Sequence, residues 1–90
     1  MKKAIVTVIG RDQVGIIAAV CAQLSERNVN VLDISQTILQ EYFTMIMLVD
    51  ISAATVPFAV LKDELAAAGA ARGLDIRVQR EDTFQAMHQL

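Results

Sequence analysis

Segments with the apolar spacing of strands and segments with the apolar spacing of helices follow one another along the chain. Their order constrains the fold more than any other feature. Residues 3–10 form a β-branched run closed by glycine, which predicts a strand. Apolar residues then recur at helical spacing over residues 15–27, which predicts an amphipathic helix. Residues 29–38 alternate and residues 43–51 are almost continuously apolar, so these two segments predict a hairpin that turns at residues 40–42.

The second half of the chain predicts one more helix and one more strand. Pro57 suits the first turn of a helix, and the apolar residues from Phe58 to Ala68 follow helical spacing. Gly69 and Gly73 compete as the end of that helix, and residues 74–78 then alternate as a strand with one wet face.

The resulting order is strand, helix, strand, strand, helix, strand. Right-handed crossovers combine this order into an α+β, ferredoxin-like βαββαβ sandwich. We therefore expect a four-stranded antiparallel sheet with two helices on one face, the first and third strands at its centre and the other two at its edges.

The length of 90 residues indicates a single domain over residues 1–90, because a chain of this size cannot bury two independent cores. We expect the core to span residues 1–80 and a C-terminal tail to span residues 81–90. Phe84 and Met87 lie three apart in that tail, after two possible capping residues, and predict a short tail helix.

The apolar content is high for so small a domain. Hydrophobic residues make up 54% of the chain and the mean hydropathy is +0.45. Because two helices cover one face of the sheet, Ile46 and Leu48, or their neighbours Phe43, Met45 and Met47, must face the other way. We expect the tail and a second copy of the chain to cover them, which predicts a homodimer or higher oligomer.

Charge and composition argue against several classes of partner. The net charge is −2 and no basic run extends beyond residues 1–3, so no nucleic-acid partner is expected. The longest aliphatic stretches are of about five residues, against roughly 20 needed to span a bilayer, so no membrane partner is expected either. The one cysteine fits a reducing compartment, and we expect a cytoplasmic location.

The chemically reactive residues do not form a catalytic group. His88 is the one histidine and lies near the C-terminus, while Cys21 lies on the apolar face of the first helix. No serine has the surroundings of a nucleophile, and the methionines lack histidine or cysteine companions. We therefore expect no enzymatic activity, no cofactor and no metal.

The loop between the first strand and the first helix is the most informative segment. The N–H groups of Val14, Gly15 and Ile16 are expected to face outward at the helix N-terminus, where they could bind a carboxylate. Asp12 beside them could accept from an ammonium group, so the loop could hold a zwitterion. The alternative is structural: Asp12 caps the helix, and Gly15 allows tight packing of helix on strand.

Three segments of the chain carry a family resemblance. Asp-Gln-Val-Gly-Ile at residues 12–16, Arg-Asn-Val-Asn-Val at residues 27–31 and Phe-Gln-Ala-Met-His at residues 84–88, together with the order of the elements, resemble the ACT domain. More narrowly, the chain resembles the small stand-alone bacterial ACT proteins related to the glycine-cleavage transcriptional repressor, and the resemblance covers essentially the whole chain.

The resemblance implies a small-molecule-sensing regulatory module that binds an amino acid or similar polar effector between paired domains. It implies ligand contacts from Asp12, from the backbone of Val14, Gly15 and Ile16, and from Asn30 across the interface. The alternative function is a ligand-free protein–protein interaction module with an unidentified protein partner.

Two positions depart from the family pattern. Val14 stands where many members have proline, which leaves the loop less preorganised for a ligand. Gly10 stands where some amino-acid-binding members have a polar side chain, which removes one possible contact.

Overall fold

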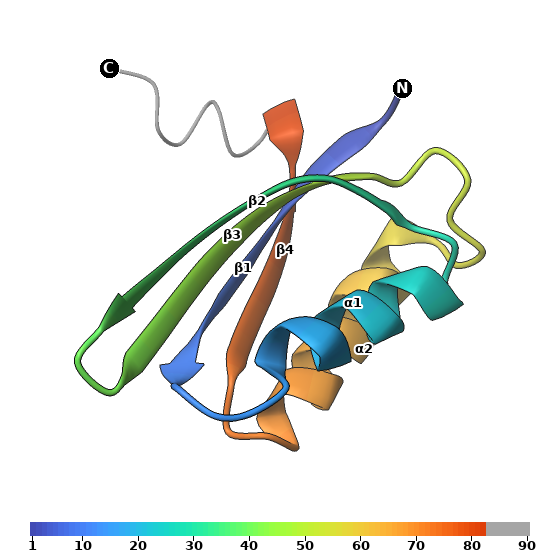
Figure 1. Cartoon of the computed structure of the whole chain (residues 1–90). Coiled ribbons are helices and arrows are strands. Elements are labelled where there is room, and N and C mark those ends of the chain that lie inside the picture. The colour runs from blue at the N-terminus through green and yellow to red at the C-terminus, as the bar shows by residue number, and fades with distance from the viewer. Residues whose placement is uncertain (83–90) are drawn as a thin grey trace.

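All six core elements are present in the predicted order within residues 1–82, the part of the chain that the computed structural model describes. Figure 1 shows two helices packed on one face of a twisted sheet. The elements are β1 (Lys3–Arg11), α1 (Ile16–Glu26), β2 (Asn30–Leu39), β3 (Tyr42–Asp50), α2 (Phe58–Ala70) and β4 (Asp75–Arg80).

The sheet has the strand order β2-β3-β1-β4, and every neighbouring pair is antiparallel. The two strands that are apolar on both faces, β1 and β3, therefore lie at the centre, as predicted. In the middle of the sheet Val6 of β1 is opposite Met47 of β3 on one side and Val78 of β4 on the other. This arrangement confirms the ferredoxin-like sandwich.

The hydrophobic core lies between the sheet and the two helices. On β3 the structure decides between the two sets of side chains: Phe43, Met45 and Met47 are buried, whereas Ile46 and Leu48 face away from the helices. The helices contribute residues at helical spacing to the same core: Ile16, Val20, Leu24, Leu61 and Leu65. One face of the sheet therefore supplies most of the buried apolar surface.

The opposite face and the β2 edge keep apolar side chains at the surface. Ile46 is 42% exposed on the helix-free face, and the whole of β2 from Leu32 to Leu39 is exposed. Figure 1 shows that the β2–β3 hairpin extends past the helices. Because β2 is an edge strand, its outer hydrogen-bonding groups have no neighbouring strand in the chain. Residues 1–82 thus leave much of the apolar excess uncovered.

The first helix ends as its sequence predicts, and an arginine then joins the two helices. Asn28, directly after the cap residue Arg27, adopts a left-handed backbone with φ 57. The Arg27 guanidinium donates to Glu64 Oε1 of α2 at 2.8 Å and to the Gln23 carbonyl of α1 at 2.8 Å. Arg27 therefore links the end of α1 to α2 at the surface.

The second helix ends at Ala70, between the two glycines that compete for its end. Gly73 provides the turn into β4 with φ 73, whereas Gly69 is buried inside the last turn of the helix. A Cβ on Gly69 would lie 2.6 Å from Ile76 Cγ1 and 3.0 Å from the Leu74 carbonyl oxygen. Gly69 therefore allows α2 to pack closely on β4.

Replacing Gly69 with alanine should destabilise the fold. Alanine favours a helix over glycine by about 1 kcal/mol, but overpacking against β4 outweighs this gain. We expect Gly69→Ala to lower the free energy of unfolding by about 1–3 kcal/mol, measured by urea denaturation.

A double variant tests the cause. Ile76→Ala removes the side chain that the new methyl group meets, so the losses in Gly69→Ala/Ile76→Ala should sum to less than the two single losses. Strict additivity would show that the contact with Ile76 is not responsible.

The end of β3 is joined to the start of β1 by Ser52. Its backbone N–H donates to Asp50 Oδ1 at 2.9 Å, and its hydroxyl oxygen accepts from the Lys2 backbone N–H at 2.8 Å. Hydrogen bonds from the Ser52 hydroxyl and backbone N–H hold the pKa of Asp50 below its ordinary value.

Ser52→Ala should raise the pKa of Asp50 toward the ordinary value of about 3.9, since the hydroxyl donor is lost. A depressed folded-state pKa stabilises the fold above the unfolded-state value, and this stabilisation is lost as the pH falls through the folded-state value. The variant should therefore have less of this stabilisation than the wild type above the unfolded-state value, and its stability should fall less as the pH is lowered. An NMR titration of the Asp50 carboxyl carbon measures the shift, and Ser35→Ala on exposed β2 should leave it unchanged.

Candidate functional site

The loop between β1 and α1 turns into the helix through a left-handed glycine. Gly15 occupies the cap position of α1 with φ 83 and ψ 14. A Cβ there would meet no atom within 4 Å, so the backbone conformation and not space requires glycine. The prediction that Gly15 allows tight helix–strand packing is therefore wrong.

The close approach in this region occurs at Gly10 instead. A Cβ on Gly10 would lie 2.6 Å from Leu74 Cδ2 and 3.3 Å from the Gly73 carbonyl oxygen. This contact gives a structural reason for glycine at this position.

Asp12 does not cap α1, so that structural alternative is also wrong. The helix has no side-chain cap and no acidic residue in its first turn. The Asp12 backbone N–H donates to the Glu41 carbonyl oxygen at 2.7 Å, while its exposed carboxylate makes no hydrogen bond or ion pair within residues 1–82. The carboxylate is thus available to a ligand.

Two long-range hydrogen bonds hold the loop in place. Besides the bond from Asp12 to Glu41 in the hairpin turn, Gln13 Nε2 donates to the Arg72 carbonyl oxygen at 3.0 Å. Figure 1 shows the β1–α1 and α2–β4 connections at the same end of the sheet. The sequence did not predict that Gln13 and Glu41 hold this loop in place, because no local pattern indicates a hydrogen-bond partner so distant in the chain.

The start of α1 provides hydrogen-bond donors next to Asp12. The first helical hydrogen bond runs from the Ala19 N–H to the Gly15 carbonyl oxygen at 2.9 Å. The N–H groups of Val14, Gly15 and Ile16 have no acceptor in the part of the chain that the structure describes. These groups carry the partial positive charge of a helix N-terminus. The loop therefore combines a free carboxylate with donors suited to an anion.

Asn30 lies at the opposite end of the sheet. It is opposite Asp50, which also pairs with Lys3 at the start of β1, and β1 then runs nine residues before the loop begins. At the usual rise of a strand this separates Asn30 from Asp12 by about 30 Å. A single chain does not bring the two residues together.

The remaining singled-out residues have structural surroundings or lie outside the described residues. Cys21 is half-buried and packs against the core, as predicted. Phe84, Met87 and His88, and with them the predicted tail helix, lie outside the described residues. Within residues 1–82 no three His, Cys, Asp or Glu side chains form a group that could hold a metal ion. None of the helices in that range is long and apolar enough to cross a membrane.

Comparison with known proteins now decides the family. A model of the ACT domain matches residues 2–79. The chain belongs to the ACT domain family. ACT domains are typically ligand-binding regulatory modules.

A UPF0237 protein of Clostridium acetobutylicum is 53% identical over 88 residues, which cover 98% of this chain and 99% of the relative. A UPF0237 protein of Methanocaldococcus jannaschii is 52% identical over 90 residues, covering all of both chains.

Solved structures of other proteins share this fold. An ACT domain protein from Streptococcus pneumoniae superposes with a TM-score of 0.82 at 41% identity, covering 97% of this chain and 98% of that one. A putative glycine cleavage system transcriptional repressor gives a TM-score of 0.77 at 22% identity, covering 88% of this chain and 45% of that one. The regulatory subunit of aspartate kinase from Thermus thermophilus gives 0.64 at 25% identity, covering 87% and 50%.

The loop geometry predicts a small effect on stability for substitution of Asp12 and a larger loss for substitution of Gly15. Asp12→Ala removes no cap and should change the free energy of unfolding by less than about 0.5 kcal/mol. Gly15→Ala forces a Cβ into a left-handed backbone and should cost about 1–2 kcal/mol. Gly15→Asn should cost less than Gly15→Ala, because asparagine tolerates this conformation better. Urea denaturation of the three variants measures these differences, and a large loss in Asp12→Ala would contradict the absence of a cap.

Proposed function

We propose that this ACT domain is a cytoplasmic regulatory module that binds an amino acid, or a similar small polar effector, at the β1–α1 loop in a homodimer. The observation that carries the proposal is the free Asp12 carboxylate beside the unpaired N–H groups of Val14, Gly15 and Ile16. Membership of a family of ligand-binding regulatory modules supports it. Apart from the Asp12 carboxylate, the loop between β1 and α1 contains no serine, cysteine, histidine or second acidic residue to act with it, so we assign it binding and not catalysis.

The two poles of an amino acid match the two halves of this loop. The carboxylate of the effector would accept from the N–H groups at the start of α1, where the helix dipole favours negative charge. Its ammonium group would donate to Asp12, forming a charge-assisted hydrogen bond. A left-handed Gly15 and the bonds of Asp12 and Gln13 to distant carbonyl groups hold the loop for this purpose.

Asn30 would complete the site only from a second subunit. Antiparallel pairing of two β2 edges would place Asn30 of the partner subunit near Leu39, at the end of β2 that leads into the hairpin turn. That turn lies against the loop, because Glu41 accepts the Asp12 N–H. The exposed outer edge and apolar side chains of β2, including Ile34 and Ile38, support this interface.

An effector bound between subunits would act by differential affinity. It would stabilise the subunit arrangement that completes the site, and so change which surface is presented to a separate partner protein. The alternative is a ligand-free interaction module. Its support is the apolar surface around the same loop, where Val14 is 98% exposed and Ile17 is 37% exposed.

A thermal-unfolding screen against the free amino acids at millimolar concentration tests the proposal. A ligand at 100 times its Kd adds about 2.7 kcal/mol to the stability of the folded state. In a domain of this size, this should raise the Tm on the order of 10 °C. We expect a shift for one or a few amino acids, and its loss in Asp12→Ala, which should itself be as stable as the wild type.

Asp63→Ala is the matched control, since Asp63 is an exposed carboxylate on α2, away from the loop. A Tm shift that survives in Asp12→Ala would contradict the assignment of the ammonium site. A flat response to all amino acids would favour the interaction module.

A further inference from the structure

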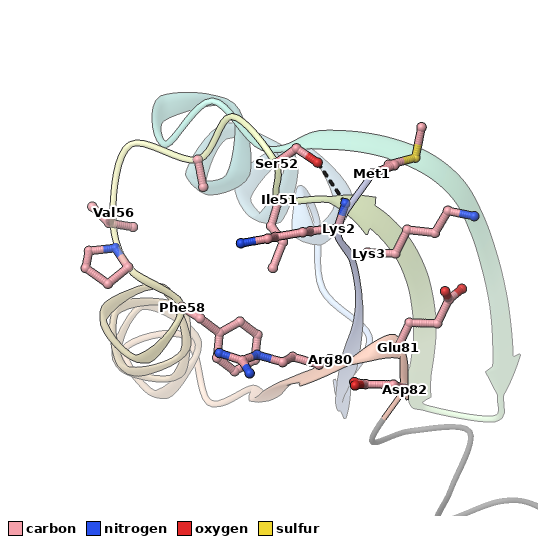
Figure 2. A pocket seen from close by; sticks show the side chains of 12 residues that line it. Met1, Lys2, Lys3, Ile51, Ser52, Val56, Phe58, Arg80, Glu81 and Asp82 are labelled. Carbon is pink, nitrogen blue, oxygen red and sulfur yellow. Dashed lines mark hydrogen bonds between the residues drawn. The ribbon is translucent and has the colours of Figure 1, made fainter.

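A cavity lies at the end of the sheet opposite the β1–α1 loop. Its volume is about 610 Å³, within the range of small-molecule sites. Figure 2 shows it between the start of β1, the β3–α2 connection and the end of β4. Its lining includes two cationic residues, Lys2 and Arg80, and an apolar group made up of Ile51, Val56, Pro57 and Phe58.

Two cations face this cavity from neighbouring strands. Arg80 is opposite Ala4 of β1, and both lie on the helix side of the sheet, as does Lys2 two residues before Ala4. Figure 2 shows the Lys2 amine and the Arg80 guanidinium on the same side of the strands. Neither side chain forms an ion pair with another described residue. Their positive charges are therefore open to an anion.

Arg80 is held in position by an aromatic ring. Its guanidinium carbon lies 4.9 Å from the centre of the Phe58 ring, a cation–π contact. The N–H groups of Arg80 donate to no acceptor among the described residues, so they can donate to a ligand. A fixed planar donor of this kind suits a carboxylate, which it can bind with two parallel hydrogen bonds.

One of the two acidic residues near the cavity lies on the side of these cations. Figure 2 shows the Glu81 carboxylate extending to the other side of the strands, together with Lys3, and the Asp82 carboxylate on the same side as Arg80. Helix α2, which begins at the cavity with Phe58, has no acidic residue in its first turn. On the helix side the two cations outnumber Asp82, so this side of the cavity carries a net positive charge in a chain whose net charge is −2.

The wall formed by the β3–α2 connection and the start of α2 is apolar apart from Ser52. Ile51, Ala54, Val56, Pro57 and Phe58 line it, and four of these residues also pack against the core from its edge: Ile51, Ala54, Val56 and Phe58. An occupant would thus place a charged group at Lys2 and Arg80 and an uncharged, apolar body against the β3–α2 connection.

We propose that this cavity is a second small-molecule site, which binds an organic monocarboxylate with an apolar body. It lies at the far end of β1 from the loop of the proposed amino-acid site and shares none of its residues. The two proposals are therefore independent, and either can fail without the other.

Chemical-shift titration of the full-length, ¹⁵N-labelled protein tests this site, with hexanoate as the probe and hexanamide as its neutral counterpart. We expect hexanoate to shift the amide signals of Ser52, Phe58 and Arg80 in a saturable manner and to leave those of Val14 and Gly15 unchanged. Hexanamide should cause much weaker shifts at the same positions, because it lacks the charge. Inorganic phosphate, which lacks the apolar body, should also bind more weakly than hexanoate.

Single substitutions assign the cations. Arg80→Gln and Lys2→Gln should each weaken hexanoate binding about tenfold or more, since each removes a charge-assisted contact. Arg77→Gln is the matched control, because Arg77 is on the same strand but on the other face, where it pairs with Asp75 at 3.3 Å. Unsaturable shifts, equal shifts with hexanamide, or undiminished binding in Arg80→Gln would each overturn the proposal. Equal binding of inorganic phosphate would overturn the assignment of an apolar body.

Discussion

The two helices cover only one face of the four-stranded sheet, and the other features of the protein depend on that constraint. The helix side takes Val6 of β1, Met47 of β3 and Val78 of β4 into a continuous core. The same alternation necessarily sends Ile5, Ile46 and their neighbours to a face without helices. Burial of one face of the sheet therefore leaves apolar side chains on the other face. The outer edge of β2 is also left without a neighbouring strand.

Local patterns were sufficient to predict the elements, their order and the two central strands. The β-branched run of β1 and the apolar run of β3 indicated burial on both sides of the sheet plane, and Pro57 and Asn28 marked helix ends through backbone preferences that act locally. The register was not predictable, because it depends on pairing between distant segments. Which of the alternating β3 side chains face the helices could be decided only once β3 was aligned with β1.

The candidate site was predictable in its residue types but not in its geometry. Asp12 resembled a helix cap in sequence, yet its backbone bonds to Glu41 and its side chain does not reach the helix. The sequence predicted close packing at Gly15, but the close contact occurs at Gly10. It could not be predicted locally, because only the fold brings Leu74 against Gly10. The cavity at Lys2 and Arg80 had no local signal, because it is assembled from both ends of the chain.

The loop and the cavity lie at opposite ends of β1, and this limits how either could affect the rest of the protein. β1 pairs with β3 along its whole length and with β4 from Ala4 to Ile9, so the structure gives it no second arrangement that a ligand at one end could stabilise. Coupling between sites requires an element with two discrete arrangements that both sites can bias. The exposed β2 edge has a free side at which a second chain could pair or separate, and its hairpin turn contacts Asp12 through Glu41. In the proposed module an effector would therefore act through subunit pairing at β2, rather than through a change within the core.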